Sequence, residues 1–123
     1  MAQKLGLDPQ TFFDIASVSS GQSWSVTTYC PVPGVGPQTP ADNSYKGGFA
    51  TGLMLKDLKL AMEAAQEAGA YTPMGGEAEE LYQRFVDRGG AHKDFSALIK
   101  MIDDSWKAPA GGGSVSPAVT TLD

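Results

Sequence analysis

The sequence predicts an all-α protein, a small bundle of helices in one domain. Three segments, which begin near residues 49, 72 and 94, carry apolar side chains at intervals of three and four residues, the period of an amphipathic helix. No segment alternates apolar and polar side chains in the way that a half-buried strand does. With 123 residues, the chain is long enough for one modest core and too short for a nucleotide-binding domain together with a substrate domain.

The amino-terminal part is predicted to hold short helices. The stretch AQKLGL reads as a helical turn that ends at Gly6, because glycine readily takes the left-handed conformation that closes a helix. Asp8 as the N-cap and Pro9 at the first helical position predict a helix from Pro9 to Val18. A further short helix or turn is expected in SGQSWSVTTYC. The predicted buried face of the Pro9 helix consists of Phe12, Ile15 and Ala16.

Residues 30–48, CPVPGVGPQTPADNSYKGG, are predicted to form a long loop. The stretch holds four prolines and four glycines and has no sustained periodicity. Loops of this length inside a compact domain tend to be binding loops, lids or segments that cross between chains. Its GVGPQT is not a dinucleotide-binding fingerprint, because it lacks the third glycine and does not lie between a strand and a helix. The pair Gly47–Gly48 would let the backbone approach a ligand closely.

Three longer helices are predicted after this loop. The first runs from Phe49 to Ala68 and ends at Gly69, with an apolar stripe of Met54, Leu58, Ala61, Met62 and Ala65. The second starts after Thr72 as N-cap and ends at residues 89–90, and it carries Leu81, Tyr82, Phe85 and Val86 and the i,i+4 ion pair of Glu80 with Arg84. The third has Asp94 as N-cap and is expected to bury Phe95, Leu98, Ile99 and Ile102, with Trp106 as a further candidate.

The chain is divided at residue 107. Residues 1–107 are assigned to the helical domain. Residues 108–123, APAGGGSVSPAVTTLD, have the composition of a flexible linker with a short extended segment, and GGGS also resembles a cloning linker.

Composition excludes several classes of partner. A formal charge of −5 and a pI near 4.7 argue against DNA and RNA, which are bound through clustered Lys and Arg. The single Cys30 cannot form an internal disulfide, and with the one histidine it cannot complete a tetrahedral zinc site. No run of about 18 apolar residues predicts a membrane span, and the amino terminus has no apolar signal core. We therefore expect a protein of the cytoplasm or, in a eukaryote, of the mitochondrial matrix.

Lys56, Asp57 and Phe49 are the candidate site residues. On one continuous helix, Phe49 and Lys56 would lie two turns apart on the same side, with Leu53 between them and Asp57 one position round. One interpretation is a solvated helix face with charges at ordinary density. The other is that Lys56 neutralises a phosphate, a carboxylate or a ribose-linked group and Asp57 orients a neighbouring donor. The residues alone leave both open.

Two reactive side chains elsewhere are given no role. His92 precedes a helix, where histidine is usually exposed, and no nucleophile or paired carboxylate is placed near it by the sequence. Cys30, before Pro31, is interpreted as an inert thiol. We therefore assign no catalytic residue and no metal ligand.

A succession of short motifs carries a family resemblance. The motifs LGLDP, SSG..W, Y.PVPG, NSY.GGF, L..KDL.LA and KDFS.L occur in this order between Ala2 and Ile102. Together they resemble the carboxy-terminal, all-helical domain of 3-hydroxyisobutyrate dehydrogenase, in the β-hydroxyacid dehydrogenase family, a bundle also found in 6-phosphogluconate dehydrogenases. The loop PVPGVGPQTPADNSYKGGF is more similar to the 3-hydroxyisobutyrate branch than to the glyoxylate or tartronate semialdehyde reductases.

The resemblance implies roles for the candidate residues. Enzymes of this family have an amino-terminal Rossmann domain that binds NAD(P), joined by a long helix to a helical domain that completes the substrate site and forms the dimer. Lys56 matches the lysine that contacts the dinucleotide, Phe49 an aromatic residue near the nicotinamide, and Asp57 an acidic residue that helps position the active-site shell. The glycine-rich fingerprint and the helix with the catalytic lysine have no match here, and Lys4 lies too late in the sequence to be that lysine.

The resemblance therefore implies half of an active site. The whole enzyme would oxidise 3-hydroxyisobutyrate to methylmalonate semialdehyde in valine catabolism, and this chain is expected to be inactive alone and to use NAD only with an amino-terminal domain. The alternative is a non-catalytic helical module for oligomerisation or interaction. Without the long helix, the stripes around Met54, Leu58 and Met62 and around Phe95, Ile99 and Ile102 would be uncovered, which predicts a homodimer or higher oligomer.

Overall fold

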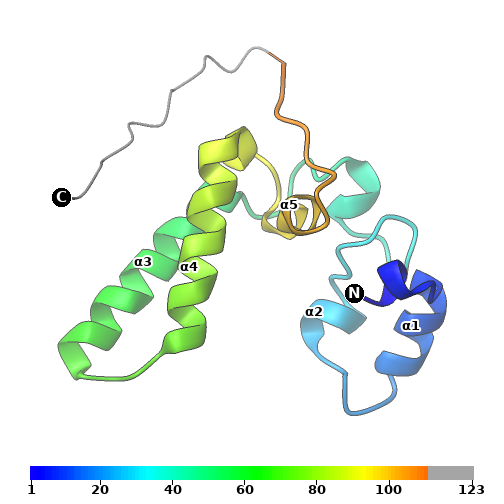
Figure 1. The fold of residues 1–123 in the computed structure, drawn as a ribbon, viewed down its shortest axis with the longest axis horizontal. Helices are drawn as coiled ribbons and strands as arrows, with labels where there is room; N and C mark the ends of the chain where they lie inside the picture. The colour runs from blue at the N-terminus through cyan, green and yellow to red at the C-terminus, as the bar shows by residue number, and fades with distance from the viewer. Residues whose placement is uncertain (111–123) are drawn as a thin grey trace.

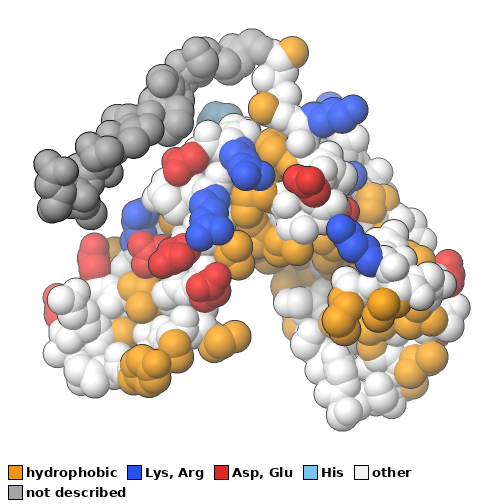
Figure 2. Space-filling view, in the orientation of Figure 1, with side chains coloured by type: hydrophobic (Ala, Val, Ile, Leu, Met, Phe, Trp, Pro, Cys, Tyr) orange, Lys and Arg blue, Asp and Glu red, His pale blue; other side chains and the backbone are white. Residues whose placement is uncertain are grey.

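The computed structural model describes residues 1–110, which form helices and loops without a strand, as the sequence predicts. In the ribbon, α3 (Thr51–Ala68) and α4 (Pro73–Phe85) form an antiparallel hairpin on one side, while α1 (Pro9–Ala16) and α2 (Trp24–Thr27) lie on the other (Figure 1). The short α5 (Leu98–Ile102) lies between the two groups. Figure 2 shows a hollow that separates them, with apolar side chains in its roof. The predicted tail falls almost wholly outside the described residues.

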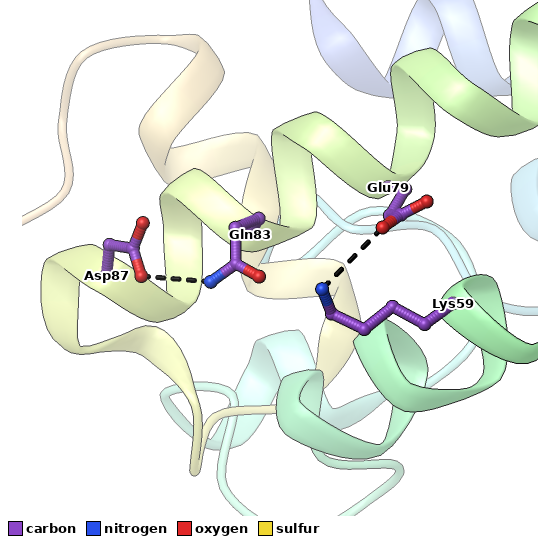
Figure 3. Close-up of polar contacts among 4 residues, drawn as sticks. All are labelled: Lys59, Glu79, Gln83 and Asp87. Atoms are coloured by element: carbon purple, nitrogen blue, oxygen red, sulfur yellow. Dashed lines mark hydrogen bonds and ion pairs between the residues drawn. The ribbon is translucent and has the colours of Figure 1, made fainter. Parts of the chain in front are cut away.

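The hairpin is tied together across its two helices. Lys59 Nζ of α3 lies 3.6 Å from Glu79 Oε1 of α4, and Gln83 donates to Asp87 Oδ1 at 2.9 to 3.1 Å further along, at 3.0 Å (Figure 3). The predicted Glu80–Arg84 pair is present on α4 at 3.7 Å. Both charges of that pair are exposed, so the pair contributes little to stability.

The start of α3 differs from the prediction. The helix begins at Thr51, and Phe49 lies before it, because the Phe49 N–H donates to the Asp94 side chain and Ala50 forms an isolated antiparallel bridge with Asp94. The predicted end is confirmed, since Gly69 takes the left-handed conformation with φ 65°. The most buried residues of α3 are Thr51 and Leu55, which the predicted stripe omits.

The end of α4 follows the glycines. After Phe85 the chain forms a π turn, η3 (Val86–Gly90), in which Gly89 has φ 87°. The predicted N-cap role of Thr72 is wrong for its side chain, whose hydroxyl donates to Met62 Sδ at 3.6 Å instead. This contact joins the first residue before α4 to the buried side of α3.

The amino-terminal prediction is right about caps and wrong about burial. The chain opens with a 3-10 turn, η1 (Ala2–Leu5), closed by a left-handed Gly6, and the Asp8 carboxylate accepts the Thr11 N–H at 3.0 Å to cap α1. On α1 only Ala16 is buried, whereas Phe12 and Ile15 are 46% and 60% exposed. No other part of the described chain covers that face.

The core is supplied by the loop as well as by helices. It comprises the buried residues Ala41, Tyr45, Phe85 and Ala97, against which Leu98, Ile99, Met101 and Trp106 pack. The loop contains a 3-10 turn, η2 (Pro40–Asn43), capped by Thr39 and Asp42 in a capping box. The stretch predicted as a binding loop or lid is therefore, in large part, a packing element.

The last predicted helix is short and split. It consists of η4 (Phe95–Ala97) and α5, with the Asp94 side chain accepting the Ser96 N–H as the predicted cap. Ile102, predicted to be buried, is 63% exposed, because α5 ends there with its outer side uncovered by the described residues. Within residues 1–110, no helix is both long and apolar enough to cross a membrane.

Candidate functional site

Lys56 and Asp57 lie on the exposed outer side of α3. Lys56 Nζ is 3.2 Å from Asp57 Oδ1, and the two side chains are 60% and 53% exposed. Phe49, half-buried, precedes the helix, so the predicted stacking of Phe49 and Lys56 along one helix is wrong. The structure places all three residues at the amino-terminal half of α3 or directly before it.

The two lysines at this part of α3 differ in their partners. Lys59 is paired with Glu79 on the neighbouring helix (Figure 3). Lys56 pairs only with the adjacent Asp57 among the described residues. The Lys56 ammonium is therefore turned away from the hairpin and is accessible to a ligand or to another domain.

Phe49 belongs to a row of four aromatic rings. Its ring meets Phe95 edge to face at 6.2 Å, and the Phe95 ring stacks on Tyr29 at 5.2 Å. Tyr29 in turn stacks on Trp24 at 5.0 Å. Trp24, at the far end of the row, is 60% exposed. Sequence reasoning did not assign Trp24 or Tyr29 to the site, although Trp24 stands in the SSG..W motif.

A buried carboxylate lies beneath this row. Asp94 is 0% exposed, and its Oδ1 accepts the Tyr29 hydroxyl and the Phe49 N–H, each at 2.8 Å. Its Oδ2 accepts the Ser96 N–H at 3.1 Å and the Ser96 hydroxyl. The sequence identified Asp94 as an N-cap only; nothing local signals the contacts to residues 29 and 49.

Gly48 has a different role from the predicted one. It has φ +68°, and a Cβ on it would overlap Asp94 Oδ1 and lie 2.8 Å from Tyr29 Oη. The space that the missing side chain leaves is thus filled by the protein itself. The prediction that Gly48 admits a ligand is wrong, whereas Gly47, with φ +77°, has no atom within 4 Å of a built Cβ.

The tyrosine hydroxyls nearby act as donors. Burial raises the pKa of Tyr29 to about 12, and the hydrogen bond and the negative charge of Asp94 add to the shift. Burial, followed by the charge of Asp94, also raises the pKa of Tyr82 to about 12. The Tyr82 hydroxyl donates to the Phe95 carbonyl at 3.2 Å. Both hydroxyls therefore stay protonated at neutral pH and organise the site rather than exchange protons.

The described residues do not enclose a pocket around Lys56. A cavity of about 320 Å³ lies in the hollow between the two groups of helices and is lined by Tyr29, Tyr82, Phe95, Ile99 and Ile102, among others. A larger one of about 570 Å³ lies at the turn of the hairpin, beside Lys59 and Tyr71. Neither is lined by Phe49, Lys56 or Asp57. Residues 1–110 also contain no cluster of three His, Cys, Asp or Glu that could hold a metal ion.

The chain is similar to dehydrogenases of known families. Residues 1–102 match the family described as NAD-binding of NADP-dependent 3-hydroxyisobutyrate dehydrogenase. A probable 3-hydroxyisobutyrate dehydrogenase of Mycobacterium tuberculosis H37Rv is 48% identical over 99 residues, which are 80% of this chain and 33% of that protein. The human mitochondrial 3-hydroxyisobutyrate dehydrogenase is 41% identical over 99 residues, 80% of this chain and 30% of that protein.

Two further comparisons concern substrate and structure. The NAD-dependent L-serine dehydrogenase of Pseudomonas aeruginosa is 44% identical over 98 residues, 80% of this chain and 33% of that protein. The solved structure titled Mycobacterium tuberculosis 3-hydroxyisobutyrate dehydrogenase with L-serine superposes with a TM-score of 0.77 at 46% identity, covering 82% of this chain and 34% of that one. The chain spans about a third of the length of these relatives.

Proposed function

The chain belongs to the 3-hydroxyisobutyrate dehydrogenase family, and we propose that residues 1–102 form the helical carboxy-terminal domain of such an enzyme. NAD is the cofactor of the family. The proposal is supported by the all-helical fold, by the match over most of the described chain and by the share of the relatives that it spans. Such a domain would complete a site whose dinucleotide-binding part lies on another domain.

The proposed reaction is the oxidation of 3-hydroxyisobutyrate to methylmalonate semialdehyde, a step of valine catabolism. NAD, when bound, supplies the acceptor for the hydride that leaves the hydroxyl-bearing carbon. The hydroxyl proton must go to a general base, and none of the three candidate residues is suited to that role. We therefore place base and cofactor cradle outside these residues, and the cytoplasm or a mitochondrial matrix as the location, as in the relatives named mitochondrial.

The available Lys56 ammonium carries the proposal. The residues fit contact with one end of a dinucleotide that is held mainly elsewhere: a point charge for a phosphate, and an aromatic edge for an apolar ring. Asp57, 3.2 Å from the ammonium, would hold it in place. Phe49 would exclude water from the reacting end, because its ring is braced by Phe95.

A second candidate substrate is L-serine. The names of the Pseudomonas relative and of the solved structure both carry it. L-Serine and 3-hydroxyisobutyrate share a hydroxymethyl carbon next to a carbon that bears a carboxylate, and they differ only in an ammonium or a methyl group. Comparing kcat/KM for the two in one preparation of active enzyme decides between them.

The 123-residue chain alone is expected to be inactive. Purified chain incubated with NAD or NADP and 3-hydroxyisobutyrate should produce no reduced cofactor, because the residues described supply neither a general base nor a phosphate cradle at Lys56. Absorbance of the reduced nicotinamide is the measurement. Turnover that disappears in Lys56→Ala would overturn the division of roles proposed above.

Lys56→Ala should weaken cofactor binding without unfolding the domain. The test uses a chimera in which residues 1–102 replace the matching segment of the Mycobacterium tuberculosis relative. A charge-assisted contact to a phosphate is worth about 1.5–3 kcal/mol, so the KM for NAD should rise by about tenfold or more. The melting temperature should hardly change, because Lys56 is exposed.

Lys59→Ala is the matched control. It removes an equal charge one turn further along α3, but from a lysine that is paired with Glu79 inside the hairpin. The KM for NAD should stay at the value of the parent chimera. Equal increases in both variants would mean that general positive charge, rather than Lys56, attracts the cofactor.

We further propose that the chain forms a homodimer or a higher oligomer. The stripe of Met54, Leu58 and Met62 is half-buried within the hairpin, contrary to the expectation that it is uncovered. Other large apolar side chains are exposed, among them Leu53 at 47%, Leu60 at 56% and Ile102 at 63%. Sedimentation at micromolar concentration should give a species of at least twice the chain mass. A strictly monomeric, folded species would contradict the proposal and weaken the alternative of an oligomerisation module.

A further inference from the structure

We propose that Asp94 is a positioning residue, whose buried carboxylate fixes Phe49 and the aromatic row at the start of α3. The inference rests on the proposed function in one respect: Phe49 is taken to face the reacting end of the cofactor. Asp94 itself is 0% exposed and would not touch cofactor or substrate. Its effect on the reaction would pass through the backbone of Phe49.

The carboxylate makes more contacts than a helix cap requires. Capping of η4 uses the Ser96 N–H on Oδ2, a role that serine or asparagine fills equally well. Oδ1 is used outside that turn, by the Phe49 N–H and the Tyr29 hydroxyl at 2.8 Å each. No cation pairs with Asp94 among the described residues, so its burial depends entirely on these neutral donors. A buried charge with this arrangement points to a requirement for a carboxylate at this place.

The backbone of Asp94 is fixed on both sides of Phe49. The Asp94 N–H donates to the Tyr45 carbonyl at 2.8 Å, and the Thr51 hydroxyl donates to the Asp94 carbonyl at 3.4 Å. The Phe95 N–H donates to the Phe49 carbonyl at 2.8 Å. Phe49 is thus held at its N–H by the Asp94 side chain and at its carbonyl by the next residue. This fixes the direction of its ring relative to α3, on which Lys56 lies.

The same carboxylate fixes the middle of the aromatic row. The Tyr29 hydroxyl is bonded to Oδ1 while its ring lies between those of Trp24 and Phe95. Tyr29 and Phe49 come from segments before and after the long loop, and one oxygen atom joins them. Loss of that oxygen should release both rings together.

Asp94→Asn is the informative variant, because it keeps the size and changes one acceptor into a donor. Whichever way the amide turns, its NH₂ faces either the Phe49 N–H and Tyr29 hydroxyl or the Ser96 N–H. In the 123-residue chain, amide hydrogen exchange at Phe49 should become at least about tenfold faster. Exchange at Leu58 and Met62, within α3, should stay unchanged. Unchanged exchange at Phe49, or equal acceleration throughout α3, would overturn the proposal.

The kinetic arm uses the chimera defined above. Asp94→Asn should lower kcat by about tenfold or more and leave the KM for NAD within about twofold, the opposite split from Lys56→Ala. An unchanged kcat, or a loss confined to the yield of folded enzyme, would overturn the functional part of the inference. If the parent chimera is inactive, the proposed function fails, and hydrogen exchange still decides whether Asp94 fixes Phe49.

A milder variant covers the case in which Asp94→Asn does not fold. Tyr29→Phe keeps the ring of the aromatic row and removes one donor to Oδ1. It should shift the near-ultraviolet circular dichroism of the stacked rings and lower kcat in the same direction by a smaller factor. Ser96→Ala is its control, because it removes a donor to Oδ2 only and should leave both readouts near those of the parent. Equal effects of the two variants, or none from Tyr29→Phe, would contradict the assigned role.

Discussion

Phe85→Ala is expected to lower the free energy of unfolding by about 3–5 kcal/mol, the range for truncation of a buried phenylalanine. Phe85 is 0% exposed, and its ring meets Trp106 edge to face at 4.7 Å. It packs in the cluster that joins the hairpin to the loop and to η4. Domains of ordinary size are stable by about 5–15 kcal/mol, so the variant should lie close to unfolding. Urea denaturation followed by far-ultraviolet circular dichroism is the measurement.

Two comparisons make this expectation specific. Phe12→Ala removes the same ring from a site that is 46% exposed and should cost less than half as much. Gly90→Ala would place a methyl group 2.6 Å from the Phe85 ring and should destabilise the parent, but it should be tolerated when Phe85 is alanine. Additive effects of Phe85→Ala and Gly90→Ala would mean that the ring does not fill the space beside Gly90.

The sequence predicts those parts of the fold that depend on neighbours in the chain. Asp8 caps α1, Gly6 and Gly69 close their helices, and Gly89 ends the run of α4, each through a conformation or a hydrogen bond within a few residues. The helical period alone predicts the α3–α4 hairpin. Such signals are local, so one sequence contains them.

The errors occur where distant residues compete. The periodicity of α3 extends back to Phe49, but Asp94, 45 positions away, takes the Phe49 N–H and holds the chain in a non-helical conformation. The loop of residues 30–48 has the composition of a lid, but Tyr45 is buried in the core, where its hydroxyl donates to the Pro31 carbonyl. No property of a single segment indicates such a partner.

The candidate site divides in the same way. Lys56 and Asp57 could be identified from their motif and their place on a helix, and the structure puts both on its exposed side. The aromatic row could not be predicted, because its members come from α2, the loop and η4 and meet only after folding. Asp94 was identified for its cap, and its longer-range contacts depend on that same assembly.

Gly48→Ala is expected to destabilise the chain by about 3–5 kcal/mol, the sum of two costs. An alanine at φ +68° is strained by about 1–2 kcal/mol. Its methyl group would also overlap the Asp94 carboxylate and lie 2.8 Å from both Pro40 Cγ and Tyr29 Oη, which adds about 1–3 kcal/mol for overpacking or forces Asp94 away from its donors.

Gly47→Ala separates these two costs. Gly47 has a similar φ of +77°, but no atom lies within 4 Å of a Cβ built on it, so this variant should show the backbone strain alone. The difference between the two free energies of unfolding, from urea titration, therefore measures how tightly Gly48 packs on Asp94. Equal losses would mean that the carboxylate yields freely to a methyl group. Asp94 could not then fix Phe49, since an anchor that moves aside at no cost cannot determine the direction of a ring.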